Sequence, residues 1–282
     1  MILFKTTIDL TQYLDRMRQQ GKTIGFVPTM GALHTGHLSL IGNCKQSAAI
    51  TVCSIFVNPT QFNDPQDFAR YPVTLEDDLL LLEKTGCDIV FLPSVNEIYP
   101  DGTSLRSEFN IGYLGNILEG KYRPGHFQGV CQVMNRLLEI VMPATLFLGQ
   151  KDYQQCMVIK KLVSLNNWGI RISIVATVRE NSGLALSSRN RRLSEKDKNS
   201  ATAIYQSLQY LKQHLQPGET HTYITEAESM INKAGFEKID YVSIADADTL
   251  EAISNWNGQT RVVALVAAFI SSVRLIDNMA LN

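Results

Sequence analysis

Short apolar runs alternate with helix-like segments through the first part of the chain. Five runs predict buried strands, at residues 23–27, 49–57, 88–92, 145–148 and 171–178. Continuous apolar runs of this length are typical of parallel strands that are covered on both faces. Between them, the apolar positions from Val130 to Val141 follow helical spacing, and residues 76–83 combine acids with a leucine run. Strands that alternate with helices predict an α/β domain with a Rossmann-like, doubly wound parallel sheet.

The pattern changes after about residue 178. A polar segment at 187–192 precedes a long predicted helix at 194–215, which a Pro-Gly pair ends, and a second helix at 223–234. Strand-like runs then follow at 240–244, 261–270 and 273–276. Helices followed by grouped strands predict a second, smaller α+β C-terminal domain. We therefore expect one domain over residues 1–178 and another over residues 179–282.

The composition narrows the classes of protein that the chain can be. Hydrophobic residues make up 45 %, charged residues 19 %, and the formal net charge is −1, so nothing indicates binding to nucleic acid or to an anionic membrane. No run approaches the ~20 apolar residues of a membrane span, and the start does not resemble a targeting segment. The five cysteines are scattered without C-x-x-C spacing, which favours buried thiols in a reducing compartment. We expect a cytoplasmic protein.

The most informative segment, PTMGALHTGHL at residues 28–38, follows the first predicted strand. We expect it to open a helix whose N–H groups and positive dipole end face an anion. Gly31 and Gly36 would let a phosphate approach the backbone. His34 and His37 share a helix face and can donate hydrogen bonds to phosphate, including the charge of a pentacoordinate phosphorus. Surface histidines and metal ligation are the alternatives, but the glycines and the strand–helix position favour phosphate.

The histidine pattern resembles the H-x-G-H signature of the nucleotidyltransferase superfamily, which includes class I aminoacyl-tRNA synthetases. Further segments, in one order along the chain, resemble the pantothenate synthetase (pantoate–β-alanine ligase) family. They are SIFVNPTQF (54–62), RPGHFQGV (123–130), GQKDYQQ (149–155), LSSRN (186–190), ADADTL (245–250) and RLIDN (274–278). The resemblance covers essentially the whole chain. It implies condensation of pantoate with β-alanine through a pantoyl-adenylate, with ATP as a substrate and AMP and pyrophosphate as products.

The resemblance also implies roles for individual residues. The first domain would bind nucleotide and pantoate, and the second would close over the active site. The residues expected to contact ATP are Met30, Gly31, Ala32, Leu33, His34, Thr35, Gly36, His37, Gly149, Gln150, Lys151, Asp152, Val178, Leu186, Ser187, Ser188 and Arg189. The expected catalytic residues are His37, His34, Lys151 and Arg189. Gln61 and Gln155 would bind pantoate through neutral amides, with Gln61 also near β-alanine. We expect glutamate at position 150, so Gln150 keeps a backbone contact but lacks a charge.

Three further expectations concern metal, assembly and rival functions. The acidic run at residues 76–78 could supply an oxygen ligand for Mg²⁺, directly or through water, or favour a helix start; we favour Asp77 as the ligand. The resemblance implies a homodimer, for which the sequence offers only apolar strands such as residues 49–57. Another nucleotidyltransferase would be the main alternative, but a tRNA synthetase should carry an RNA-binding domain. A non-catalytic nucleotide-binding regulator is disfavoured by the His34/His37 pair with Lys151.

Overall fold

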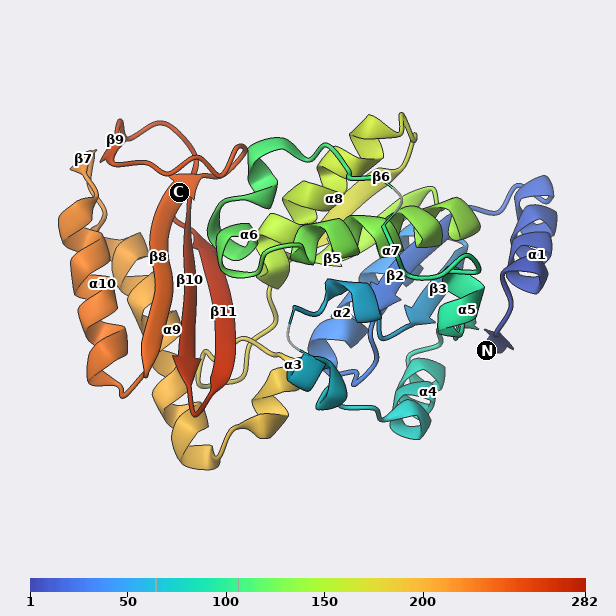
Figure 1. Cartoon of the computed structure of the whole chain (residues 1–282), viewed down its shortest axis with the longest axis horizontal. Helices are drawn as coiled ribbons and strands as arrows, with labels where there is room; N and C mark the ends of the chain where they lie inside the picture. Colours follow the sequence, from blue (N-terminus) through green and yellow to red (C-terminus); the bar gives the residue numbers. More distant parts are fainter. Residues whose placement is uncertain (64, 106) are drawn as a thin grey trace. The chain divides into compact units, whose positions relative to one another are not determined.

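The computed structural model describes residues 1–63, 65–105 and 107–282 (Figure 1). These residues form two compact units. The first comprises residues 1–150 and 154–176, and the second comprises residues 151–153 and 177–282. The chain therefore passes between the units on either side of the short segment 151–153 and again after residue 176. The last of these crossings lies two residues before the domain boundary that we expected after residue 178.

The first unit is built on a parallel sheet. Its described residues form six strands in the order β1-β4-β3-β2-β5-β6. They are β1 (Ile2–Phe4), β2 (Ile24–Thr29), β3 (Ile50–Ile55), β4 (Ile89–Phe91), β5 (Thr145–Gly149) and β6 (Arg171–Val175). Because β2 lies between β3 and β5, the strand order reverses beside it, and ligands bind parallel sheets at the carboxyl ends of strands at such a point. Phe26 pairs with Leu146, so Thr29 and Gly149 end β2 and β5 at the same edge.

Helices cover both faces of this sheet. The helical segments along residues 7–165, of which η3 and the first residue of α8 fall largely in the 151–153 segment of the second unit, are α1 (Thr7–Gln19), α2 (Thr35–Ser47), η1 (Pro59–Gln61), α3 (Pro65–Ala69), α4 (Leu75–Lys84), α5 (Val95–Ile98), η2 (Gly112–Gly115), α6 (Leu118–Tyr122), α7 (His126–Val141), η3 (Gln150–Asp152) and α8 (Tyr153–Leu165). On one face, Val27 and Cys53 pack with Ile41 of α2 and Leu82 of α4. Phe26, which points to the opposite face, is also buried. The Rossmann-like, doubly wound fold is confirmed.

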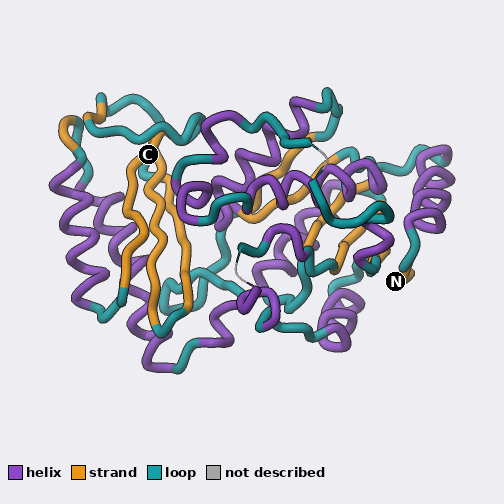
Figure 2. Tube along the Cα trace, in the orientation of Figure 1, coloured by secondary structure: helices purple, strands orange, loops and turns teal. Residues whose placement is uncertain are grey.

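The second unit packs two long helices on an antiparallel sheet (Figure 2). Following η4 (Ser188–Arg192), its elements are α9 (Glu195–His214), β7 (Gly218–Glu219), α10 (His221–Lys233), β8 (Lys238–Asp246), β9 (Asn255–Trp256), β10 (Val262–Ile270) and β11 (Val273–Ala280). Among the described residues, β11, β10 and β8 form one sheet in that order, and β7 pairs with β9. Leu208 of α9, Ile231 of α10 and Val266 of β10 lie in one hydrophobic core. The smaller α+β domain is confirmed.

Some elements differ from the sequence expectation. The sequence pattern did not predict the short edge strand β1, and α7 begins at His126, four residues before the start of the predicted helical run. Strand β3 lies between β4 and β2, and every residue from Ile50 to Ile55 is buried. Our suggestion that this strand lines a dimer interface is therefore wrong, because its apolar side chains are already used by the core of its own unit.

All five cysteines are free and buried, as we predicted for structural thiols. Burial raises the pKa of Cys44 to about 11 and the pKa values of Cys87 and Cys131 to about 12. These thiols therefore stay protonated and serve packing. Over the part of the chain that the structure describes, no helix is both long and apolar enough to cross a membrane.

Candidate active site

The loop between β2 and α2 adopts an uncommon backbone conformation. Gly31 has φ +78° and Ala32 has φ +49°, both in the left-handed region that side chains disfavour. The Ala32 N–H donates to Asp78 Oδ2 at 2.8 Å, and the Leu33 N–H donates to Asp78 Oδ1 at 2.7 Å. A Cβ at Gly31 would lie 3.0 Å from Asp78 Oδ2. The loop is therefore shaped around one carboxylate.

Asp78 comes from the first turn of α4 and is only 1 % exposed. It also accepts a hydrogen bond from Thr74 Oγ1 at 3.2 Å, and the helix dipole favours a negative charge at this position. We expected the N–H groups at the start of the following helix, α2, to face an anion. Just before the helix, the Ala32 and Leu33 N–H groups instead donate to a carboxylate of the protein itself, whereas a phosphate at the N–H groups of α2 stays a prediction. The sequence showed an acidic helix start but not which acid turns inward.

The two signature histidines cap the start of α2 with their side chains. His34 Nδ1 accepts from the Gly36 N–H at 3.2 Å, and His37 Nδ1 accepts from the His34 N–H at 3.3 Å. The ring centroids are 4.1 Å apart. Since each Nδ1 is an acceptor, the proton of each neutral ring lies on Nε2. The caps therefore place the hydrogen of each neutral ring on Nε2, where it can act as a hydrogen-bond donor.

Asp77, our predicted Mg²⁺ ligand, is exposed on α4 beside the buried Asp78. No group of three or more His, Cys, Asp and Glu side chains that could hold a metal occurs among residues 1–63, 65–105 and 107–282. Mg²⁺ prefers oxygen ligands and commonly takes only one or two carboxylates, with water and substrate phosphates completing its shell. The chemistry of an exposed Asp77 fits that mode.

Gln61 ends η1 and lies against the signature loop. Its Nε2 donates to Met30 Sδ at 2.8 Å, and its Oε1 accepts from Asn58 Nδ2 at 3.3 Å. Its backbone carbonyl accepts from His126 Nδ1 at 2.8 Å, and His126 Nε2 accepts from Arg123 Nη1 at 3.1 Å. The predicted pantoate residue is thus held beside the predicted ATP segment by both its amide and its backbone.

Asn58 is a residue of this region that our sequence reasoning missed. It is 1 % exposed, donates to the Gly129 carbonyl at 3.2 Å and accepts from the Tyr99 hydroxyl at 2.9 Å. Burial raises the pKa of Tyr99 to about 12, so its hydroxyl remains a donor. A Cβ at Gly129 would lie 2.0 Å from the Thr60 carbonyl oxygen, so α7 can approach η1 closely only through glycine. The motif containing Asn58 was visible in the sequence, but its bonding partners were not.

The GQKDYQQ segment divides between the two units. Gly149 and Gln150 belong to the first unit, as does Gln155, which is half-buried on α8. The neighbouring Gln154 is 3 % exposed, accepts from the Glu119 N–H and donates to two backbone carbonyls, so it is structural. The side-chain amide of Gln155 makes no hydrogen bond with another described residue. Of the two neighbouring glutamines, Gln154 is thus committed to backbone partners, and pantoate binding by Gln155 stays a prediction.

The predicted phosphate residues of the second unit form two local structures. Lys151 Nζ lies 3.8 Å from Asp152 Oδ1, and the Lys151 carbonyl accepts from Asn278 Nδ2 at 2.8 Å. In the other structure, the Leu186 N–H donates to the Val178 carbonyl at 3.0 Å, which closes a hairpin over residues 178–186.

The polar segment after this hairpin leads directly into η4 (Ser188–Arg192). Ser187 caps η4 by accepting from the Arg189 N–H at 3.3 Å, and Ser188 is buried. The Ser187 hydroxyl therefore shapes the backbone of the loop that carries Arg189.

Comparison with known proteins identifies the family. The family model for pantoate-beta-alanine ligase matches residues 2–280. The chain belongs to the pantoate–β-alanine ligase family. It is 42 % identical to the pantothenate synthetase of Cytophaga hutchinsonii over 285 residues, covering 100 % of this chain and 99 % of the relative. The pantothenate synthetase of Bacteroides thetaiotaomicron is 41 % identical, with 99 % and 98 % of the two chains covered. The resemblance that the motifs indicated is confirmed.

Solved structures of pantoate–β-alanine ligases share this fold. The crystal structure of pantothenate synthetase from Thermus thermophilus has a TM-score of 0.90 and 37 % identity, and the match covers 100 % of this chain and 99 % of that chain. The ligase from Francisella tularensis, crystallised with beta-gamma ATP and β-alanine, has a TM-score of 0.84 and 40 % identity, with 100 % and 98 % covered.

In this member of the ligase family, each unit brings together some of the predicted residues. The first joins His34 to His37 and Met30 to Gln61, whereas Thr35 is exposed at the start of α2. The second unit contains Lys151 and the hairpin with its following loop. The individual ligand contacts of these residues stay predictions.

Proposed function

We propose that this pantoate–β-alanine ligase joins pantoate to β-alanine with ATP as a substrate, through a pantoyl-adenylate, and releases AMP and pyrophosphate. The family match over residues 2–280 carries this proposal. Relatives named pantothenate synthetase match over the full length of the chain, and a relative was crystallised with beta-gamma ATP and β-alanine. The product would serve pantothenate biosynthesis.

The reaction needs two steps because a carboxylate is a poor electrophile. In the first step, a pantoate carboxylate oxygen attacks the α-phosphorus of ATP in line, and the bond to the pyrophosphate oxygen breaks. In the second, the neutral amine of β-alanine attacks the acyl carbon, loses a proton, and displaces AMP. The first step depends mainly on positioning and charge stabilisation. The second requires that water be kept from the anhydride.

In the first unit, His34 and His37 would donate from Nε2 to the phosphate, with His37 as the principal donor. Their Nδ1 atoms accept backbone N–H groups, which supports this role because the tautomer is set before ATP binds. Gln61 and Gln155 would hold pantoate through neutral amides that orient a carboxylate without an added positive charge. Gln61 would also lie near β-alanine.

In the second unit, Lys151, Ser188 and Arg189 would stabilise the triphosphate, and Asp152 would accept from ribose hydroxyls. Lys151 is a compact cation suited to phosphate, and Arg189 follows a capped turn at Ser187. We propose that the C-terminal domain closes over the active site when ATP binds.

Asp77 would hold Mg²⁺ directly or through water. When bound, Mg²⁺ would neutralise charge on the departing pyrophosphate. We further propose that the protein is a cytoplasmic homodimer. Its five free, buried cysteines are consistent with a reducing compartment.

Pyrophosphate exchange tests the stepwise reaction. With pantoate and Mg²⁺ present and β-alanine absent, labelled pyrophosphate should enter ATP. Omitting pantoate should abolish the exchange, because no carboxylate then attacks the α-phosphorus. Exchange that strictly required β-alanine would rule out a free-standing adenylate. Absence of pantothenate with all substrates present would favour the alternatives, another nucleotidyltransferase or a non-catalytic regulator.

A variant pair tests the pantoate site within the same assay. Gln155→Ala should weaken pantoate-dependent exchange more than it weakens ATP binding. Gln206→Ala, an exposed glutamine on α9, is the matched control and should leave both unchanged. Equal loss of ATP binding and exchange in Gln155→Ala would contradict a pantoate role.

A further inference from the structure

Two adjacent polar residues near the end of β11 are buried although they lie on an edge strand. Asp277 is 5 % exposed and Asn278 is 2 % exposed, and β11 pairs on one side with β10. Buried polar groups are costly unless they find partners. Their partners in the second unit are Lys151, which we assigned to ATP binding, and Arg179, which lies in the hairpin between the assigned residues Val178 and Leu186.

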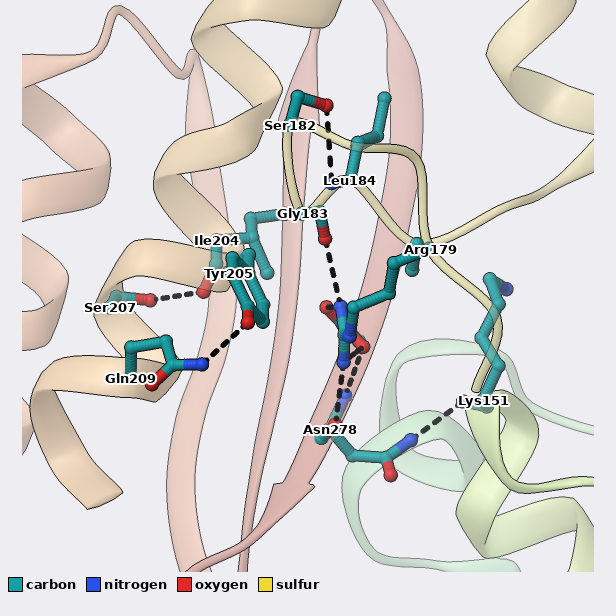
Figure 3. A network of polar contacts seen from close by, with 12 residues as sticks. Lys151, Arg179, Ser182, Gly183, Leu184, Ile204, Tyr205, Ser207, Gln209 and Asn278 are labelled. Atoms are coloured by element: carbon teal, nitrogen blue, oxygen red, sulfur yellow. Dashed lines mark hydrogen bonds and ion pairs between the residues drawn. The ribbon is translucent and has the colours of Figure 1, made fainter. Parts of the chain in front are cut away.

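Arg179 is the partner of Asp277. Its two terminal nitrogens contact the two carboxylate oxygens at 2.5 and 3.0 Å, a bidentate pair in which both side chains are largely buried. The guanidinium also donates to the carbonyls of Gly183, at 3.1 Å, and Asn278, at 3.3 Å, and lies 4.6 Å from the centroid of the Tyr205 ring (Figure 3). A planar fork with this many fixed partners has little freedom. Arg179 therefore anchors its own segment to β11 and α9.

The anchored segment is the hairpin that leads into the phosphate loop. The backbones of Arg179 and Ala185 pair in an antiparallel β-bridge across the hairpin, and Asn190 Nδ2 donates to the Ala185 carbonyl at 3.0 Å. A Cβ at Gly183 would lie 2.1 Å from Tyr205 Cδ1, so the hairpin turn packs tightly on α9. The residues that follow are Ser187, Ser188 and Arg189. The hairpin that precedes these three residues is thus held against β11 by Arg179.

Asn278 ties the other segment to the same strand. Its side-chain Nδ2 donates to the Lys151 carbonyl at 2.8 Å. Its backbone N–H donates to Asp277 Oδ1 at 2.8 Å, and its backbone carbonyl accepts from Arg179. Figure 3 shows Asn278 between Arg179 and Lys151. One residue therefore contacts both the anchor of the hairpin and the backbone of Lys151.

We propose that Asn278 is a positioning residue. Together with the Arg179–Asp277 pair, it fixes the position of Lys151 relative to the Ser187–Arg189 loop, so that Lys151 and the loop can bind the same triphosphate. This inference rests on the proposed function, because it assumes that both segments bind ATP. Asn278 does not touch the reacting atoms; it acts through the backbone of Lys151.

A double-mutant cycle on ATP affinity tests the proposal. Asn278→Ala in the full-length protein should raise the dissociation constant of a non-hydrolysable ATP analogue about tenfold and lower the exchange rate by about 10- to 100-fold, since small misplacements of catalytic groups have effects of this size. The KM for pantoate should change less than about twofold, because that site lies on other residues. In a Lys151→Ala background, Asn278→Ala should change ATP affinity less than about twofold, as expected for residues that act together.

Two further variants separate positioning from folding. Asn282→Ala also loses two hydrogen bonds at the end of the chain, to Val262 and Thr260, but has no link to Lys151. It should lower the melting temperature without changing ATP affinity. Asn278→Asp keeps the size of the side chain but faces the Lys151 carbonyl with an acceptor, so it should reproduce the loss if Asn278→Ala does not fold. An unchanged affinity in the folded variant, or the same loss in the Lys151→Ala background, would overturn the proposal. Failure of wild-type protein to bind ATP would instead count against the proposed function.

Discussion

Replacing Asp78 by asparagine tests the carboxylate that shapes the signature loop. Asp78 accepts the N–H groups of Ala32 and Leu33, one on each carboxylate oxygen, at 2.8 and 2.7 Å. Asparagine has nearly the same shape but offers one oxygen. Its NH₂ group must then face an N–H that already needs an acceptor. Asp77→Asn, the neighbouring and exposed carboxylate on α4, is the matched control.

The expected cost follows from this geometry. A hydrogen bond to a charged group contributes about 1.5–3 kcal/mol, and a buried donor left without an acceptor costs about 1–3 kcal/mol. Removing a buried charge offsets part of this sum. We therefore expect Asp78→Asn to lower the free energy of unfolding by about 3 kcal/mol, or the melting temperature by about 6–12 °C. Asp77→Asn should stay within about 0.5 kcal/mol, as exposed substitutions usually do.

Thermal unfolding and pyrophosphate exchange provide the two readouts. Asp78→Asn should lower the exchange rate by about tenfold or more even where it is fully folded, because Ala32 would leave its strained conformation and the histidines follow it directly in the chain. Asp77→Asn should keep its melting temperature and need more Mg²⁺ for exchange. An Asp78→Asn protein with the wild-type melting temperature and the wild-type exchange rate would refute the role of Asp78 in holding the signature loop.

Two further substitutions test the first unit. His37→Ala should fold and lose about 10²-fold or more in turnover, the usual scale for one transition-state donor, and near-wild-type turnover would exclude His37 as that donor. Gly129→Ala should lower the free energy of unfolding by about 3 kcal/mol or more and raise the KM for pantoate, because its Cβ would lie 2.0 Å from the Thr60 carbonyl oxygen. Gly42→Ala on α2 is its control in denaturant unfolding: apart from its chain neighbours and its own helix backbone, no atom of the described residues lies within 4 Å of the added Cβ, so it should stabilise by up to about 1 kcal/mol. Equal effects of the two alanines would contradict the close approach of α7 and η1.

The sequence by itself determined the class of fold and the family. Apolar runs and helical spacing are local properties, so they were sufficient for the parallel sheet, for long helices such as α9, and for the antiparallel strands of the second unit. Buried thiols were equally predictable, because isolated cysteines without metal spacing usually pack as small apolar groups. The H-x-G-H segment and the motifs after it were sufficient for the family because their residues are contiguous. Their spacing also placed His34 and His37 at the start of one helix.

Only the tertiary structure decided which polar residues support those motifs. Asp78 reaches Ala32 across 46 positions, Asn58 reaches Gly129 across 71, and Asn278 reaches Lys151 across 127. No periodicity links such pairs, because hydrogen bonds between distant segments depend on how helices and strands pack. The acidic start of α4 shows the difference: adjacent carboxylates have the same local signal, yet one is exposed and one is enclosed. Which of them turns inward depends on the rotation of the helix against the sheet, and packing of its apolar side chains sets that rotation.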